Sequence, residues 1–286
     1  MSQPDDFAFG TVGSPPSVPP KPGGSIGAIS YLASLGLTAF ELAWVQSVRV
    51  SEATCEAIRQ ASSRSGVSIS VHAPYFINLN ADRKEWPKAR KRLMDAARYG
   101  ALAGATDIVF HPGSYFGSEP AVVLEKAIPR LRACAEELKA EGVDVILRPE
   151  TMGKSAMLGS VEDTVAMAKE VPGVLPCLDF AHLHSRPGDG TINTVEEWTG
   201  ILRQVRQQLG VAAARHLHIH LSGIAYGPKG EREHLMLVES DMDVVALLRA
   251  LRREGCAGRI LCESPHQDTD ALLLKQAWEH QASLPA

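Results

Sequence analysis

Short apolar stretches rich in β-branched residues alternate with longer stretches of helical periodicity along the whole chain. Eight strands are predicted, at residues 7–11, 38–42, 67–72, 107–111, 143–150, 174–179, 216–221 and 259–263. Eight helices are predicted to follow them, at residues 25–35, 51–65, 86–103, 120–141, 160–170, 194–209, 241–254 and 269–280. This alternation predicts an α/β fold, a (β/α)8 TIM barrel forming a single domain over residues 1–286, with residues 1–24 holding the first strand and a Pro- and Gly-rich loop.

Local signals support these boundaries. Ser51 and Ser160 stand where side chains cap the starts of helices. Glycines follow the ends of four predicted helices, at Gly36, Gly104, Gly142 and Gly255. A doubly wound open sheet is disfavoured, because the first turn, GTVG at residues 10–13, lacks the GxGxxG form of a nucleotide-binding turn.

The composition is that of a soluble globular protein, with 45% hydrophobic and 22% charged residues. No apolar run reaches the roughly 18 residues that suggest a membrane span. The start of the chain lacks the basic and apolar regions of a secretory signal. The five cysteines form no CxxC pair, which indicates a reduced, cytoplasmic setting: Cys55, Cys134, Cys177, Cys256 and Cys262.

A net charge of −4 excludes the global basic excess that is the plainest sign of a nucleic-acid-binding protein. Any DNA contact must therefore come from a local patch. Residues 83–92 read RKEWPKARKR and hold six basic residues against the single acid Glu85. This run is interpreted either as a solvated helix start or as a phosphate-binding patch.

Potential metal ligands stand at the ends of six consecutive predicted strands. In an α/β barrel these ends share one face, where active sites are built. A lone histidine or carboxylate there is most often structural, but several carboxylates on one rim repel each other unless cations neutralise them. Histidine and carboxylate donors without cysteine favour Zn²⁺ or Mn²⁺. The predicted ligands are His72, His111, Glu150, Asp179, His220 and Glu263.

Further donors follow two of these strands. His182 comes three residues after Asp179, and Glu231 and His234 lie in the segment after the seventh strand. They are interpreted as ligands of an additional metal ion, or alternatively as exposed polar residues of a loop.

Several segments of the chain resemble the endonuclease IV family of apurinic/apyrimidinic endonucleases, within the xylose-isomerase-like barrel superfamily. They are VHAPYFINL (71–79), FHPGS (110–114), PETMGK (149–154), LDFAH (178–182), HIHLSG (218–223), GEREHL (230–235) and CESP (262–265). The segment HLSGIAYGPKGEREHL (220–235) resembles a divergent or archaeal-type branch of the family. The resemblance implies two or three metal ions, mostly zinc, that cleave the DNA backbone 5′ to an abasic site in base excision repair.

The ligand assignment that the resemblance implies has three parts. His72, His111 and a bridging Glu150 hold the first metal ion. Glu150, Asp179, a seventh-strand histidine and Glu263 hold the second. His182, Glu231 and His234 hold the third.

Two of these assignments keep an alternative. The family usually has Asp-x-His for the last two ligands, whereas this chain has Glu231 three residues before His234, with Glu233 as the alternative carboxylate. His216, His218 and His220 are expected on one face of the seventh strand, because side chains alternate along it. His220 is favoured as the ligand, since it lies nearest the rim, and His218 is its alternative.

The resemblance also implies a mechanism and a partner. Metal-activated water attacks the phosphodiester, with Glu150 bridging the metals and Glu263 orienting or accepting a proton. The partner is double-stranded DNA with abasic sites, where extrusion of the damaged nucleotide costs least. Tyr75 and Phe76 match the family's wedge position, although packing against the core is equally compatible with them. Lys154 and Arg186 are expected to contact phosphates, and the chain is expected to act as a monomer.

Two other functions remain open. A metal-dependent sugar isomerase or epimerase on the same barrel needs one metal ion, held by Glu150, Asp179, His220 and Glu263. A non-catalytic barrel, stabilised by its metals and used as a binding module, is the other alternative.

Overall fold

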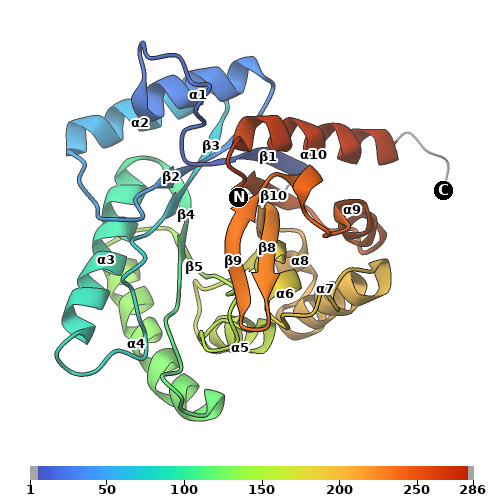
Figure 1. Ribbon diagram of the computed structural model, residues 1–286. Coiled ribbons are helices and arrows are strands. Elements are labelled where there is room, and N and C mark those ends of the chain that lie inside the picture. The colour runs from blue at the N-terminus through green and yellow to red at the C-terminus, as the bar shows by residue number, and fades with distance from the viewer. Residues whose placement is uncertain (1–5, 283–286) are drawn as a thin grey trace.

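The parallel sheet of the computed structural model, which describes residues 6–282, closes into a barrel (Figure 1). Its eight strands are β1 (Phe7–Val12), β2 (Ala39–Ala43), β3 (Ser68–His72), β4 (Ala105–Phe110), β5 (Ile146–Pro149), β6 (Cys177–Asp179), β7 (Leu217–Leu221) and β10 (Gly258–Cys262). They pair in the order β5-β4-β3-β2-β1-β10-β7-β6. Two parallel bridges, Leu147 to Val174 and Glu150 to Cys177, join β5 to the β6 segment and complete the ring. The predicted TIM barrel is confirmed.

Helices surround the sheet, as the apolar faces of the predicted helices require (Figure 1). They are α1 (Gly24–Ser34), α2 (Glu52–Ser65), α3 (Trp86–Leu102), α4 (Pro120–Ala140), α5 (Val161–Glu170), α7 (Val195–Leu209), α8 (Val211–Ala214), α9 (Val244–Arg253) and α10 (Gln267–Ala282). The predicted helices match all of these except the short α8. No helix within residues 6–282 is long and apolar enough to cross a membrane.

The predicted starts of α2 and α5 are confirmed by their caps, whereas α9 starts three residues later than predicted, at Val244. Ser160 Oγ accepts a hydrogen bond from Asp163 N at 3.1 Å, and Asp163 Oδ2 accepts one from Ser160 N at 2.9 Å. Ser51 caps α2 by accepting from Thr54 N. The four predicted terminal glycines all adopt positive φ, which residues with a β-carbon rarely do.

The segment after β7 differs from its prediction as a loop. It forms an antiparallel hairpin of β8 (Gly223–Gly227) and β9 (Gly230–Leu235), followed by the 3-10 helix η1 (Leu237–Glu239). The turn glycines and a run of charged residues obscured the strand pattern of this hairpin. A second short helix, α6 (Phe180–Ser185), begins directly after β6. Both additions lie at the end of the barrel where the predicted ligands gather.

The strands also begin and end at different residues than predicted. The predicted strands at 143–150 and 174–179 shorten to Ile146–Pro149 and Cys177–Asp179. The strands that were predicted to end at His111, Glu150 and Glu263 each end one residue earlier, so these three residues lie just beyond their strands. Residues 1–5 of the predicted first segment and the last four residues of the predicted domain lie outside the described residues.

A buried ion network lies beneath the ligand cluster, nearer the starts of the strands. Asp107 Oδ1 accepts from Arg148 Nε at 2.7 Å, and Asp107 Oδ2 lies 3.1 Å from an Arg259 nitrogen. Arg148 donates further to the carbonyls of Pro176 and His216. Burial raises the pKa of Asp107, but the two guanidinium groups outweigh burial and hold that pKa far below its usual range. The network ties β4, β5 and β10 together beneath the site.

Candidate metal centre

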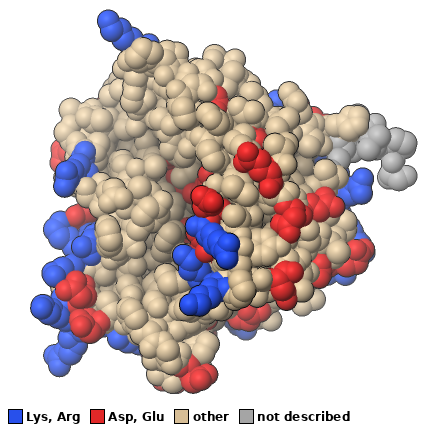
Figure 2. All heavy atoms as spheres, viewed as in Figure 1, with Lys and Arg blue, Asp and Glu red and all other residues tan. Residues whose placement is uncertain are grey.

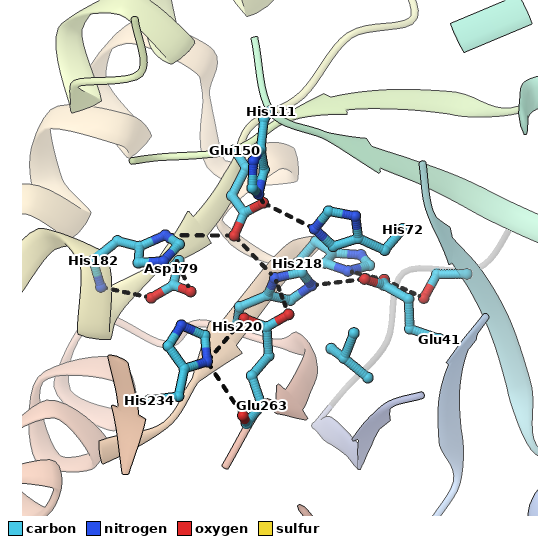
Figure 3. A network of polar contacts seen from close by, with 12 residues as sticks. Glu41, His72, His111, Glu150, Asp179, His182, His218, His220, His234 and Glu263 are labelled. Atoms are coloured by element: carbon cyan, nitrogen blue, oxygen red, sulfur yellow. Dashed lines mark hydrogen bonds and ion pairs between the residues drawn. The ribbon is translucent and has the colours of Figure 1, made fainter. Parts of the chain in front are cut away.

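The six predicted strand-end ligands converge at the carboxyl ends of their strands (Figure 3). Parallel strands of a barrel all end on one face, so residues that are about 30 to 40 positions apart in sequence meet there. Glu150, Asp179 and His220 are fully buried, and His72 nearly so. The cluster opens to a hollow of about 300 Å³ lined by Tyr75, His111, His182, Glu231, His234 and Glu263 together with His72. Figure 2 shows this face hollowed near its centre, with acidic atoms in the wall.

Glu150 lies at the centre of the cluster. Its Oε2 is 3.3 Å from His72 Nε2 and 3.2 Å from His111 Nε2. Its Oε1 is 3.2 Å from His220 Nδ1. His182 Nδ1 lies 3.6 Å from the same Oε1. Two imidazoles therefore face each oxygen of the carboxylate, which is the arrangement expected of a carboxylate that bridges two cations.

A second group of donors adjoins Glu150. One donor atom from each of Glu150, Asp179, His220 and Glu263 lies within 4.8 Å of the others. His220 Nδ1 is 3.5 Å from Glu263 Oε1. This is a four-ligand set of the kind that one divalent cation takes.

The third group lies between α6 and the hairpin. His182, Glu231 and His234 each offer a donor atom within 4.8 Å of the others. His182 Nε2 is 3.7 Å from Glu231 Oε2, and His234 Nδ1 is 3.7 Å from Glu263 Oε2. The structure thus places this group next to the first two, and the hairpin supplies two of its three members.

A β-bulge explains how Glu231 and His234 face the same site. Residues three apart on a regular strand point to opposite faces. In the hairpin, Ala225 pairs with Glu233 and Tyr226 pairs with Glu231, so Arg232 is one extra residue on β9. The extra residue restores a common face for Glu231 and His234, while Glu233 is exposed. The spacing that departs from Asp-x-His is therefore compatible with a metal site.

The loop after β5 fixes the position of Glu231. Glu231 N donates to Gly153 O at 3.0 Å. A β-carbon on Gly153 would lie 2.7 Å from Glu231 Cβ, so only glycine permits this approach.

The carboxylates and imidazoles of the cluster shift each other's pKa values. Burial raises the pKa of Glu150, but His111 and His220 outweigh burial and hold that pKa well below its usual range. Burial, together with the nearby charges of Glu263 and Glu150, raises the pKa of Asp179. Burial lowers the pKa of His182, but Asp179 and Glu150 prevail and raise it to about 9. The carboxylates thus favour the protonated, positively charged form of His182 in this cluster.

The donor atoms fit divalent cations. Among the described residues, Glu150 Oε2 and Asp179 Oδ2 are buried without a hydrogen-bond partner. Buried carboxylate oxygens without partners are costly, and cations provide the missing interaction. Mixed imidazole and carboxylate donors suit Zn²⁺ or Mn²⁺.

The structure separates the two candidate histidines of β7. His220 Nδ1 faces Glu150 and Glu263, at the distances given for the first two groups. His218 Nε2 instead lies 2.9 Å from Glu41 Oε2. His218 also shares a buried group of possible donor atoms with Cys177 and His220, and burial raises the pKa of the Cys177 thiol.

Glu41 is a residue of the site that the sequence prediction did not include. It lies on β2, fully buried, and Ser70 Oγ donates to its Oε2 at 2.6 Å. Its Oε1 is 2.9 Å from His220 Nε2, the nitrogen opposite the one that faces Glu150. A charged residue within the apolar stretch AFELA was the available signal.

The residues predicted to contact DNA differ in exposure and in their contacts. The ring of Tyr75 stacks on His111 with 5.0 Å between centroids, and Phe76 is 60% exposed. Lys154 is exposed. Arg186 donates to the carbonyls of Met152, Lys154 and Met157, so its guanidinium holds the loop after β5. Phosphate contact by Lys154 or Arg186 stays a prediction.

The basic run 83–92 starts α3, and carboxylates balance half of its cations. Lys88 pairs with Glu85, Lys91 with Asp95 and Arg90 with Glu137. Figure 2 shows the resulting mixture of basic and acidic atoms along the side that carries α3. Arg92 is different: it donates to the Phe76 carbonyl at 3.2 Å and lies over the Phe76 ring.

A family model described as "Xylose isomerase-like TIM barrel" matches residues 29–284. The chain belongs to this family. Within it, an uncharacterized protein of Methanocaldococcus jannaschii is 35% identical over 271 residues, covering 94% of this chain and 96% of its own. Endonuclease 4 of Thermus thermophilus is 26% identical over 270 residues, covering 91% of this chain and 95% of its own. The predicted resemblance to endonuclease IV is confirmed.

Solved structures share this fold. The crystal structure of endonuclease IV from Thermus thermophilus has a TM-score of 0.69 at 23% identity, covering 96% of this chain and 99% of its own. A D-tagatose 3-epimerase-like protein has a TM-score of 0.71 at 17% identity, covering 96% and 97%. The same barrel thus carries both an endonuclease and an epimerase-like protein, and the choice between these activities depends on the site itself.

Proposed function

We propose that this chain is a metal-dependent apurinic/apyrimidinic endonuclease that hydrolyses the DNA phosphodiester 5′ to an abasic site in base excision repair. One observation carries the proposal: a third donor group, His182, Glu231 and His234, lies beside the histidines and carboxylates that surround Glu150. A sugar epimerase needs only one cation, so two further donor groups on the same rim have no use in it.

The proposed ligands divide among the three groups. His72, His111 and Glu150 hold one Zn²⁺, Asp179, His220 and Glu263 with Glu150 hold another, and the third group holds the last. When bound, the ions supply Lewis-acid stabilisation of the phosphoryl charge and activate water for attack. Mn²⁺ has the same ligand preferences at imidazole and carboxylate donors.

The side chains position the substrate and move its protons. Glu263 stands where the cluster meets the hollow and is partly exposed, so its carboxylate orients the attacking water and accepts its proton. Tyr75 closes the hollow beside His111. Burial and the charges of Glu263 and Glu150 raise the pKa of Tyr75 to about 12, so the phenol stays protonated and can donate to a phosphate oxygen.

The partner in this proposal is double-stranded DNA that carries an abasic site, bound by one copy of the chain. The net charge of −4 requires local contacts rather than a basic surface. Phe76 with Arg92, and exposed Lys154 in the loop after β5, provide such contacts.

The test is nicking of a duplex with one abasic site by protein with measured metal content. We expect a 3′-hydroxyl and a 5′-deoxyribose phosphate as products. Glu263→Gln should abolish nicking, and its metal content should be measured alongside. Matched intact duplex should remain uncut. If protein with full metal content leaves the abasic duplex intact, the proposal is wrong.

One observation favours the epimerase alternative enough to test it. The group of Glu150, Asp179, His220 and Glu263 is by itself the one-cation set that the alternative needs, and an epimerase-like structure shares the fold. Incubation with ketohexoses and analysis of the C3 epimers decides the matter. Epimer formation with one metal ion per chain would establish that alternative.

A further inference from the structure

Arg186 directly follows α6 and reaches back to the loop that joins β5 to α5. Its Nη1 donates to the carbonyl of Met152 at 2.8 Å and to the carbonyl of Lys154 at 2.7 Å. Its Nη2 donates to the carbonyl of Met157 at 3.0 Å and lies 3.5 Å from the hydroxyl oxygen of Tyr115. Each terminal nitrogen of a guanidinium carries two hydrogens, so both of these nitrogens are fully used within the protein.

The two carbonyls that Nη1 holds lie on either side of Gly153. Met152 and Lys154 are the residues before and after it, so Nη1 holds the peptide groups that flank the one containing the Gly153 carbonyl. The base of the loop is closed by Met152 N, which donates to Gly159 O at 2.8 Å. Arg186 therefore sets the direction in which the Gly153 carbonyl points.

The Gly153 carbonyl in turn holds the hairpin. It accepts a hydrogen bond from Glu231 N at 3.0 Å, and within residues 6–282 this is the only backbone hydrogen bond that joins β9 to a segment outside the hairpin. A β-carbon on Gly230 would lie 2.1 Å from Gly153 O, and a β-carbon on Gly153 would lie 2.9 Å from Glu231 Oε2. The loop thus contacts β9 directly at the carboxylate of the third donor group.

Helix α6 acts on this donor group in two ways. His182 and Arg186 are four residues apart, and Arg186 N donates to His182 O at 2.9 Å. Side chains with this spacing lie on one face of a helix. His182 offers a donor atom itself, whereas Arg186 acts on Glu231 through Gly153. The 3.7 Å between His182 Nε2 and Glu231 Oε2 consequently depends on the guanidinium.

The other two donor groups have a different support. Asp179 and His220 are register partners on neighbouring strands of the barrel, and Glu150 forms a parallel bridge with Cys177. The hairpin forms a separate two-stranded sheet and has no such register with the barrel. Loss of the hydrogen bonds of Arg186 should therefore loosen the third group and leave the first two unchanged.

We propose that Arg186 is a positioning residue for the third metal ion: it holds the Gly153 carbonyl against Glu231 and so keeps Glu231 within reach of His182. This inference rests on the proposed function, which assigns a cation to His182, Glu231 and His234. In this role Arg186 contacts neither the ion nor the DNA. Because the ligands are already in place, binding of the ion does not have to order the hairpin.

The first experiment measures metal binding by the whole, metal-loaded protein without DNA. A chelating dye withdraws the ions in order of affinity, and elemental analysis counts those that remain. Arg186→Ala should weaken the binding of one ion per chain by about 10- to 100-fold, the usual effect of losing a group that orients a metal ligand. The affinity for the other ions should not change.

Arg130→Ala is the matched control. Arg130 Nη1 donates to the carbonyls of Leu79 and Ala81 at 2.8 and 2.7 Å, so it holds the loop after β3 in the same way. This variant should keep every ion. Equal loss of an ion from both variants would reveal a general loosening of the fold and would overturn the proposal.

A double variant separates positioning from general stabilisation. If Arg186 acts through Glu231, Arg186→Ala combined with Glu231→Gln should retain as many ions, and nick as fast, as Glu231→Gln alone. Residues that act independently have additive effects. A further loss of ions or of nicking in the double variant would therefore contradict the positioning role.

The outcomes also separate this inference from the proposed function. If Arg186→Ala keeps every ion but binds abasic DNA more weakly, Arg186 contacts phosphate, so the inference is wrong and the proposed function stands. If the third ion depends on Arg186 in a protein that does not nick, the inference stands and the proposed function is wrong. If the wild-type protein holds a single ion per chain, both are wrong.

Discussion

Glu41 Oε1 lies 2.9 Å from His220 Nε2, while Nδ1 of the same imidazole faces Glu150 and Glu263. A carboxylate on one ring nitrogen fixes the orientation of a histidine and increases the basicity of the other nitrogen toward a metal ion. Glu41 is thus a positioning residue, and it acts from a strand that provides no ligand itself.

Replacement of Glu41 should weaken metal binding at the His220 site. We expect Glu41→Gln to reduce the affinity of that site for Zn²⁺ by about 10- to 100-fold, as losses of such supporting carboxylates typically do. Competition with a chelating dye measures the affinity. Ser70→Ala is the control, because it removes a hydrogen bond to Glu41 and leaves the contact with His220 in place. Equal effects of both variants would contradict the role of Glu41.

The two histidines of β7 should differ in their effect on metal content. His220→Ala should lower the number of bound ions by at least one per chain, because its Nδ1 lies among the donor atoms of the second group. His218→Ala should keep the full number, because His218 contacts Glu41 instead. Elemental analysis of the purified variants measures both. Loss of metal in His218→Ala with retention in His220→Ala would reverse the assignment.

The hairpin carboxylates provide a matched pair of variants. Glu231→Gln should lose the third metal ion, since Glu231 faces His182, and nicking should fall by about ten-fold or more, as expected when one ion that stabilises phosphoryl charge is lost. Glu233→Gln changes an exposed side chain on the same strand and should retain both metal and activity. Metal content and nicking rate should be measured on the same preparations. Loss of the ion from Glu233→Gln alone would show that the bulge does not select Glu231.

The buried network of Asp107 should contribute to stability over a defined pH range. Asp107→Asn leaves Arg148 and Arg259 buried without their carboxylate, which should lower the free energy of unfolding by about 3 to 5 kcal/mol. Because the pKa of Asp107 is lowered in the folded state, its contribution is complete above the unfolded pKa of about 3.9 and is lost as the pH falls through the folded pKa.

Denaturant unfolding at several pH values checks this prediction. The difference between wild type and Asp107→Asn should stay constant from about pH 5 upward, one unit above the unfolded pKa, and shrink below it. Asp144→Asn, on the exposed segment before β5, should change stability by less than about 0.5 kcal/mol. A difference that grows as the pH falls would contradict the assigned direction of the pKa shift.

The sequence by itself determined the barrel and most of the rim. Alternating periodicities, capping serines and terminal glycines are local signals, and strand ends of a parallel barrel share one face whatever the details of packing. His72, His111, Glu150, Asp179 and Glu263 could therefore be named from the sequence alone.

Only the tertiary structure decided the rest. His218 and His220 point to the same face of β7, so the alternation of side chains cannot distinguish them. Glu41 on β2 contacts both, and only the structure shows that His220 keeps its other ring nitrogen toward Glu150. The bulge at Arg232 depends on pairing between two strands, so no spacing rule along one strand reveals it. The contact of Arg186 with the carbonyls beside Gly153 likewise forms only in the folded chain. These features arise from contacts between distant segments, whereas periodicity and capping record only the neighbours of each residue along the chain.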